Sequence, residues 1–203
     1  MIARKWTLYL LTLCTSMLVL TGCSQPGVAK DTAARERAVP FTIVASGDST
    51  ADIGSATTYA WKPDRHAVHG APRLGDVPVA ELLEDAISGA MNKKGYRHTG
   101  PRDAGDLQIG YLVAIGDAEA VRKMEDRYGV QPGLAVASPD PGRYEKGTLI
   151  ITVVDRRSGL VAWRSALQGF ASQNISEETR RERINDIVTR MLAGIPARAV
   201  QAP

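Results

Sequence analysis

Cys23 is the residue whose type and setting most clearly allow a chemical reaction. It follows Leu20, Thr21 and Gly22, so a leucine and two small residues precede a cysteine at the end of an apolar run. A cysteine thiolate attacks a lipid donor far more readily than a serine hydroxyl would. The pattern predicts a bacterial lipoprotein signal. We expect a diacylglyceryl group on the sulfur of Cys23, together with an amide-linked acyl chain such as palmitate.

The first 22 residues have the layout of a secretory signal peptide. Arg4 and Lys5 form a positive end, the apolar run from Trp6 to Leu20 follows, and small residues mark the cleavage point. A membrane-spanning helix would need about 20 apolar residues, more than this run provides. Ser24 stands where an aspartate would favour retention in the inner membrane. We therefore expect a lipid anchor on the periplasmic face of the outer membrane, with the inner membrane as the alternative.

Two histidines could supply metal ligands. His66 and His69 are three residues apart, and Asp64 or Asp76 would have to complete the site. Histidines in a polar loop are more often simply solvated, and no cysteine is near. We therefore expect neither a metal nor a cofactor.

Two pairs of carboxylates could act as acid and base, namely Asp48 with Asp52 and Asp103 with Asp106. Each pair lies in turn-rich sequence, where aspartate is favoured because its side chain accepts hydrogen bonds from nearby backbone amides. The sequence also has no Gly-x-Ser-x-Gly elbow and no glycine-rich phosphate loop. We expect no catalytic residue and predict that the protein is not an enzyme.

Arginines gather at two places that could touch anionic lipid head groups or a polyanionic polymer. Arg156 and Arg157 lie at a predicted hairpin tip, and the others lie on the predicted last helix: Arg180, Arg181 and Arg183. We favour a solvated helix face for the second group, since three glutamates lie beside it: Glu177, Glu178 and Glu182. Trp61 and Trp163 could form a recognition surface, but they are in phase with apolar neighbours, which favours packing in the core.

Composition limits the alternatives further. The chain has 203 residues and two cysteines, and Cys14 would leave with the signal, so we expect no disulfide. Removing Arg4 and Lys5 lowers the formal charge by two, from +3 to +1, which argues against a nucleic-acid partner. We divide the chain into a signal peptide (1–22), a lipidated tether (23–40), one periplasmic domain (41–197) and a tail (198–203).

Hydrophobic periodicity predicts the elements of that domain. Apolar residues at helical spacing predict a helix from Val79 that ends at Lys93-Lys94-Gly95, and a last helix that Ser176 caps and Pro196 ends. A short helix is predicted over 117–128. Alternation and β-branched runs predict strands over 41–45, 57–61, 96–99, 107–115, 148–154 and 160–168, and we expect Pro63 to stop the second of them.

These elements predict the fold class. Residues 155–159 have the composition of a tight turn, so the last two strands form a β-hairpin. Each main helix has one apolar stripe and therefore one buried face. We predict an α+β fold: a single two-layer sandwich with an antiparallel-rich sheet that two main helices cover on one face.

The sequence resembles a known family, the bacterial lipoproteins that carry the domain of unknown function 4136. The resemblance covers about Phe41 to Pro196 and lies in short motifs in a shared order: Thr58-Tyr59-Ala60-Trp61, Lys94-Gly95-Tyr96, Asp106-Leu107, Tyr144-Glu145-Lys146-Gly147-Thr148-Leu149, Val154-Asp155, Ala162-Trp163-Arg164 and the closing helix from Ile184 to Pro196. It implies the fold and an envelope location. It implies no activity and supplies no catalytic residue.

The sequence leaves three hypotheses for function. The first is a non-catalytic, lipid-anchored domain that binds or scaffolds another envelope component, either a protein or a polymer. The second is a hydrolase or transferase that acts on an envelope polymer through a site assembled from distant residues. The third is a carrier that holds an apolar ligand between helices and sheet. Under each of the three hypotheses, the protein contacts the membrane through lipid on Cys23.

Overall fold

The computed structural model describes residues 34, 39–48, 53–70, 76–100, 105–116, 118–129, 137–140, 142–172 and 174–198, with the side chains of 63–66 and 128 left out. The predicted signal peptide, Cys23, most of the tether and the last five residues lie outside this set. Within it, no helix is both long enough and apolar enough to cross a membrane.

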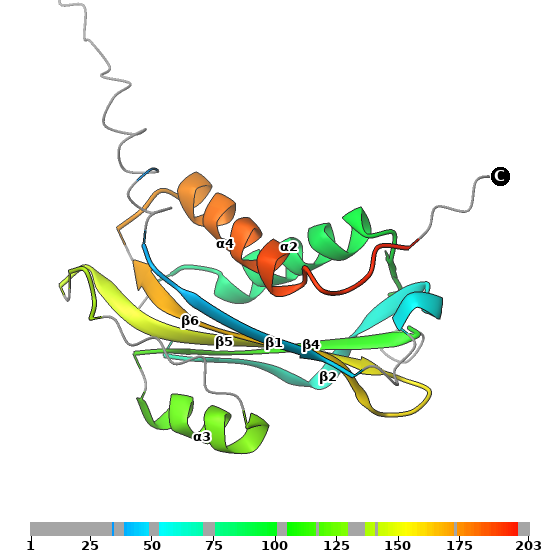
Figure 1. Ribbon diagram of the computed structural model, residues 1–203. Coiled ribbons are helices and arrows are strands. Elements are labelled where there is room, and N and C mark those ends of the chain that lie inside the picture. Colours follow the sequence, from blue (N-terminus) through cyan, green and yellow to red (C-terminus); the bar gives the residue numbers. More distant parts are fainter. Residues whose placement is uncertain are drawn as a thin grey trace, which may run out of the picture.

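A mixed sheet forms the centre of the described structure (Figure 1). It has six strands among the described residues, in the order β1-β6-β5-β4-β2-β3. Pairing is antiparallel from β1 to β4 and parallel between β4, β2 and β3. The strands are β1 (Thr42–Gly47), β2 (Thr58–His69), β3 (Arg97–His98), β4 (Leu107–Ile115), β5 (Tyr144–Asp155) and β6 (Val161–Ser172), with a 3₁₀ turn at Ile53–Ser55 before β2.

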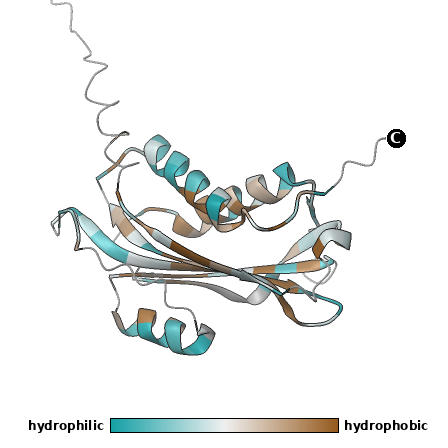
Figure 2. Ribbon diagram, in the orientation of Figure 1, coloured by the Kyte–Doolittle hydropathy of each residue, from teal (hydrophilic) through white to brown (hydrophobic). Residues whose placement is uncertain are grey.

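Two helices, α2 (Val79–Lys93) and α4 (Glu177–Met191), cover one face of the sheet (Figure 1). Ser176 begins α4 by accepting the backbone N–H of Thr179 at 3.2 Å, and Gly95 follows α2 with φ +88°. Their apolar stripes join the strands in one large core (Figure 2), whose helical members include Leu83, Ile87, Met91, Val188 and Met191. The predicted sandwich is confirmed.

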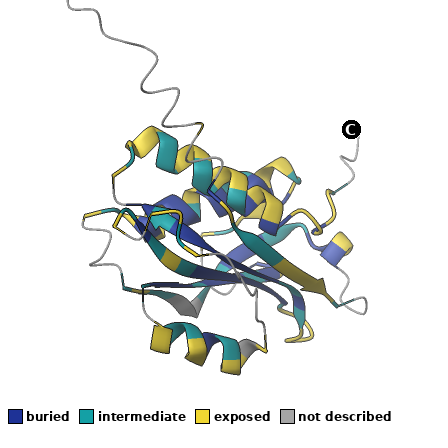
Figure 3. Ribbon diagram, turned by 60° about the vertical axis from the view of Figure 1, so that its left-hand side comes forward, coloured by how far each residue is buried: buried dark blue, intermediate teal, exposed yellow. Residues whose placement is uncertain are grey.

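A third helix, α3 (Ala118–Tyr128), lies against the opposite face of the sheet (Figure 1). Met124 is buried there against Ala114, Ile150 and Ala166. The outer sides of all three helices and most of β1 are exposed (Figure 3). The helix predicted over 117–128 is thus confirmed, and it gives the sheet partial cover on its second face.

The prediction that Pro63 stops the second strand is wrong. β2 continues to His69 and pairs with β4 on both sides of a register shift between Trp61 and His66. Proline cannot donate to a strand ladder, so within sheets it is confined to edges and irregular positions such as a bulge. The irregularity accommodates Pro63 and lets the strand resume beyond it.

The segment after α4 closes one end of the sandwich. The Lys94 ammonium donates to the carbonyl oxygen of Ile195 at 2.6 Å, and the Tyr96 hydroxyl donates to that of Pro196 at 3.0 Å. The backbone N–H of Arg198 donates to Lys94 at 2.8 Å. The C-terminal ends of α2 and α4 are therefore tied together, while their N-terminal ends lie at the other end of the sheet (Figure 1).

Candidate functional site

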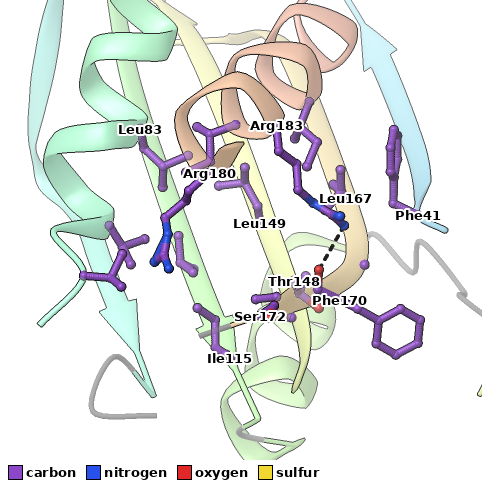
Figure 4. A pocket seen from close by; sticks show the side chains of 18 of the residues that line it. Phe41, Leu83, Ile115, Thr148, Leu149, Leu167, Phe170, Ser172, Arg180 and Arg183 are labelled. Atoms are coloured by element: carbon purple, nitrogen blue, oxygen red, sulfur yellow. Dashed lines mark hydrogen bonds between the residues drawn. The ribbon is translucent and has the colours of Figure 1, made fainter. Parts of the chain in front are cut away.

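An apolar groove opens at the end of the sandwich where α4 begins (Figure 4). Its volume is about 130 Å³. Side chains from β4, β5 and β6 form the floor, and side chains from α2 and α4 form the walls. The apolar lining includes Phe41, Leu83, Val113, Ile115, Leu149, Leu167, Ile175, Ile184 and Ile187.

Two glycines lie in the floor of the groove. Gly147 of β5 and Gly169 of β6 face each other in register, and both line the groove. A Cβ atom at Gly169 would lie 3.1 Å from the Cβ atom of Phe41, and one at Gly147 would lie 3.5 Å from Cγ1 of Ile115. A side chain at position 169 would therefore crowd Phe41, and one at position 147 would contact Ile115.

Among the described residues that line the groove, Arg180 and Arg183 alone carry a charge. Arg183 donates from Nη2 to the carbonyl oxygen of Phe170 at 3.0 Å (Figure 4), and Arg180 donates from Nη2 to that of Ile175 at 3.4 Å. Both side chains are half-buried. These contacts place two guanidinium groups beside an apolar surface.

The prediction that all three arginines lie on a solvated helix face is therefore wrong for Arg180 and Arg183. It is confirmed for Arg181, which is exposed and donates to Glu177 at 2.9 Å and to Asp85 at 3.4 Å. The helical period of 3.6 residues explains the difference, since positions 180, 183, 184 and 187 share one side of α4.

The N-terminal segment joins the fold next to the groove. Val39 is buried in a small cluster with Tyr144 and Phe170, and Phe41 lines the groove itself. The chain that comes from Cys23 therefore reaches the domain at the groove end.

Of the four candidate metal ligands, His69 and Asp76 have side chains that the structure describes. His69 is exposed in β2, as is Asp76 before α2, while the side chains of His66 and Asp64 lie outside the described set. The prediction of a loop at 66–69 is wrong, because this segment belongs to β2. No group of three or more histidine, cysteine or acidic side chains comes together in the described part of the chain.

Asp106 anchors two strands. Its Oδ2 atom accepts bonds from the backbone N–H and the hydroxyl of both Thr57 and Thr58, at 2.8 to 3.0 Å. Chiefly through the Thr57 N–H, these bonds lower the pKa of Asp106 to about 2, although burial opposes them. Asp106 therefore has a structural role, but its partners lie in a distant segment of the chain and not among the neighbouring amides that the turn prediction implied. Asp48 lies at the end of β1 and bonds Ala162 through its backbone, and Asp52 and Asp103 lie outside the described residues.

The predicted hairpin tip is confirmed. The Asp155 carboxylate accepts the N–H of Arg157 at 2.8 Å and the hydroxyl of Ser158 at 2.9 Å, and Gly159 has φ +71°. The N–H of Arg157 is the main cause that lowers the pKa of Asp155. Arg156 and Arg157 are exposed beside a polar hollow of about 400 Å³ that Asp106 also lines. Asp155 thus shapes the turn.

The tryptophans pack in the core, as predicted. Trp61 lies edge-on to Tyr59 and Tyr111, with ring centroids 6.1 and 6.4 Å apart. The indole N–H of Trp163 donates to the carbonyl oxygen of Met191 at 3.1 Å, which ties β6 to the end of α4. Both rings are half-buried against the main core.

The class of protein is thus defined by its structure: an α+β sandwich with an apolar groove, rimmed by arginine, between the sheet and the start of α4. The family model of the domain of unknown function DUF4136 matches residues 43–197. The chain belongs to this family, as its short motifs indicated. No curated protein matches the chain.

Three solved structures illustrate what the chain is similar to. One is a DUF4136 family protein from Bacteroides thetaiotaomicron, at 14% identity and a TM-score of 0.49, covering 78% of this chain and 98% of that one. A PelC dodecamer from Paraburkholderia phytofirmans has 9% identity and a TM-score of 0.47, covering 79% and 100%. The lipoprotein GNA1162 from Neisseria meningitidis has 10% identity and a TM-score of 0.37, covering 68% and 98%.

Proposed function

We propose that the protein is a lipoprotein of the cell envelope, anchored through lipid on Cys23 to the periplasmic face of the outer membrane. Its folded domain binds another envelope component, and it does so without catalysing a reaction. The observation that carries the binding role is the open apolar groove between α4 and the sheet.

The sequence supports the anchor and its distance from the domain. The motif Leu20-Thr21-Gly22-Cys23 follows a signal-like segment, and the chain joins the fold at Val39. Sixteen residue steps of about 3.3 Å span at most about 50 Å. An anchored domain would therefore stay close to its membrane, with the groove at the end that the tether reaches.

The groove supports a binding role because it leaves apolar surface open at one end of the core. Burying apolar surface is favourable by about 25 cal/mol per Å². Ligand sites in proteins are typically concave and mostly apolar, with a few polar groups that fix orientation. Arg180 and Arg183 provide such groups at this groove.

The lowered pKa and the hydrogen bonds of Asp106 support a non-catalytic role. A carboxyl group with a pKa of about 2 is a weak base at neutral pH. Its Oδ2 atom is already occupied by Thr57 and Thr58. Of the four carboxylates that the sequence offered for acid–base chemistry, Asp106 thus stabilises the fold.

Photo-crosslinking in intact cells tests the binding role. A photoreactive amino acid replaces Ile175, which lines the groove in the loop before α4, in the otherwise native, anchored chain. The matched control carries it at Leu160, an exposed apolar residue of the hairpin. We expect a discrete adduct from position 175 and not from position 160.

Cys23→Ala in the same background should abolish or strongly reduce the adduct from position 175, because the released domain would no longer stay beside its membrane partner. The binding role would be contradicted if both positions gave the same adducts, or if position 175 gave none. Ala171→Phe, which places a ring in the groove, is a second check and should remove the adduct without unfolding the domain.

A further inference from the structure

We propose that the groove holds the end of one fatty acyl chain whose anionic headgroup is bound by Arg180 and Arg183. The inference rests on the proposed function, since it takes the groove to be a binding site, and it names the ligand class. The ligand is an anionic amphiphile drawn from the membrane, distinct from the lipid on Cys23 itself.

The size and lining of the groove fit an acyl chain. A dry apolar cavity of about 150 Å³ holds a benzene molecule, so a groove of about 130 Å³ holds a chain segment of several methylenes. The facing glycines Gly147 and Gly169 add no side chains to the floor, and Phe41 packs closely over Gly169. The rest of a longer chain would extend through the open mouth.

The lining favours an acyl chain over a peptide segment. A bound peptide brings amide groups that need hydrogen-bond partners when they leave water, whereas an acyl chain brings none. Among the described residues that line the groove, the side chains besides the arginines that can form hydrogen bonds are Thr148 and Ser172. Thr148 accepts from Gln168 at 3.5 Å, and Ser172 accepts from the backbone N–H of Asn174 at 3.2 Å.

The charge at the mouth favours an anionic headgroup. Arg180 and Arg183 are three residues apart on α4, so their side chains lie on the same side of the helix. Their bonds to the carbonyl oxygens of Ile175 and Phe170 hold them at the groove. A guanidinium group binds carboxylate or phosphate through paired N–H donors. No acidic side chain is among the described residues that line this groove.

The position of the groove fits a ligand from the bilayer. Phe41 lines the groove, and Val39 packs beside Phe170 at the same end. The tether from Cys23 arrives there and can span at most about 50 Å. Lipid of the anchoring membrane is therefore within reach of the mouth.

The experiment uses the full-length lipidated chain in nanodiscs of phosphatidylcholine. Decanoate that carries a photoreactive group and an alkyne is the probe, and mass spectrometry locates the labelled residues. We expect labelling within residues 165–190, which include the β6 and α4 sides of the groove. Unlabelled decanoate should compete with the probe, and decyltrimethylammonium, which has the same chain and a cationic headgroup, should not.

The arginine variants provide the matched comparison. R180Q/R183Q should need about tenfold more probe for the same labelling, because charge-assisted bonds to the headgroup are lost. R181Q removes a neighbouring arginine that faces Glu177 and Asp85, and it should label like the native chain. Ala171→Phe should lose the labelling while its melting temperature stays close to the native value, which separates a blocked groove from an unfolded domain.

The outcomes separate this inference from the proposed function. Equal labelling of R180Q/R183Q and the native chain, or equal competition by decyltrimethylammonium, would overturn the anionic headgroup. If decanoate fails to label while position 175 still crosslinks to an envelope protein in cells, the lipid is wrong and the binding role stands. Labelling spread evenly over the chain would also overturn the inference.

Discussion

Asp106 joins the start of β4 to the start of β2 through a single carboxylate oxygen. Four donors of Thr57 and Thr58 point at Oδ2, and the backbone N–H of Asp106 returns a bond of 3.1 Å to the Thr58 hydroxyl. This pairing connects residues almost fifty positions apart. The pKa of about 2 reflects how strongly the site favours the charged carboxylate.

Replacing Asp106 by Asn should lower the free energy of unfolding by about 1 kcal/mol at pH 7. The amide oxygen is a weaker acceptor than a carboxylate, and exposure to water limits the loss. The folded pKa lies below the unfolded value of 3.8, so the stabilisation is complete above about pH 4 and is lost as the pH falls through about 2. Urea unfolding across this range is the measurement.

Asp126→Asn is the control, because Asp126 is exposed on α3. Above about pH 4 the native chain should be more stable than Asp106→Asn. As the pH falls to about 2, this difference in the free energy of unfolding between the native chain and Asp106→Asn should disappear. A constant difference between them at every pH would show that the carboxylate charge is not what holds Thr57 and Thr58.

The order of charges in the sequence did not predict which arginines of α4 line the groove. Arg180, Arg181 and Arg183 are neighbours in sequence, and nearby glutamates favoured a solvated face for all of them. The helical period would have indicated the positions of Arg180 and Arg183. Arg180 is four residues before Ile184 and Arg183 is four before Ile187, so each lies on the same side of α4 as an apolar residue. Arginine can lay its aliphatic stem along an apolar surface, so its charge alone does not place it outward.

At the scale of elements, the parts that local patterns specify were predicted well. Both main helices, β4 and the hairpin of β5 and β6 follow from periodicity, capping and turn residues within each segment. β2 could not be predicted in full, because the irregularity that accommodates Pro63 depends on pairing with β4. The groove could not be predicted either, since its floor depends on the register that brings Gly147 opposite Gly169.

Two glycine-to-alanine substitutions at helices should change the stability of the protein in opposite directions. Gly89 is within α2 and a Cβ atom there meets no other atom within 4 Å, so Gly89→Ala should stabilise the protein by about 0.5–1 kcal/mol. Gly194 follows α4, and its Cβ atom would overlap the Trp163 ring, whose indole N–H is bonded to Met191. Gly194→Ala should therefore destabilise the protein by about 1–3 kcal/mol.

Thermal unfolding of the two variants beside the native chain measures both effects. Gly89→Ala serves as the control for the substitution itself, because the same methyl group is added without a steric conflict. If Gly194→Ala unfolded at the native temperature, the ring of Trp163 would not be fixed between β6 and the end of α4.

At the scale of the whole molecule, the two ends of the sandwich differ. Lys94 and Tyr96 donate to the chain after α4, Arg198 of that chain donates back to Lys94, and these bonds close one end. The other end receives the N-terminal segment at Val39 and opens into the groove. Under the proposed function, the tether from Cys23 would therefore join the domain at the end where the groove opens.

The measurement that tests this account most directly is metabolic labelling of Cys23. Cells that express the full chain are fed an alkyne-bearing palmitate, and the label is read in separated inner and outer membranes. We expect a labelled protein in the outer membrane, loss of label and of membrane association in Cys23→Ala, and no change in Cys14→Ala. Label that persists in Cys23→Ala, or an unlabelled native chain, would contradict the lipid anchor.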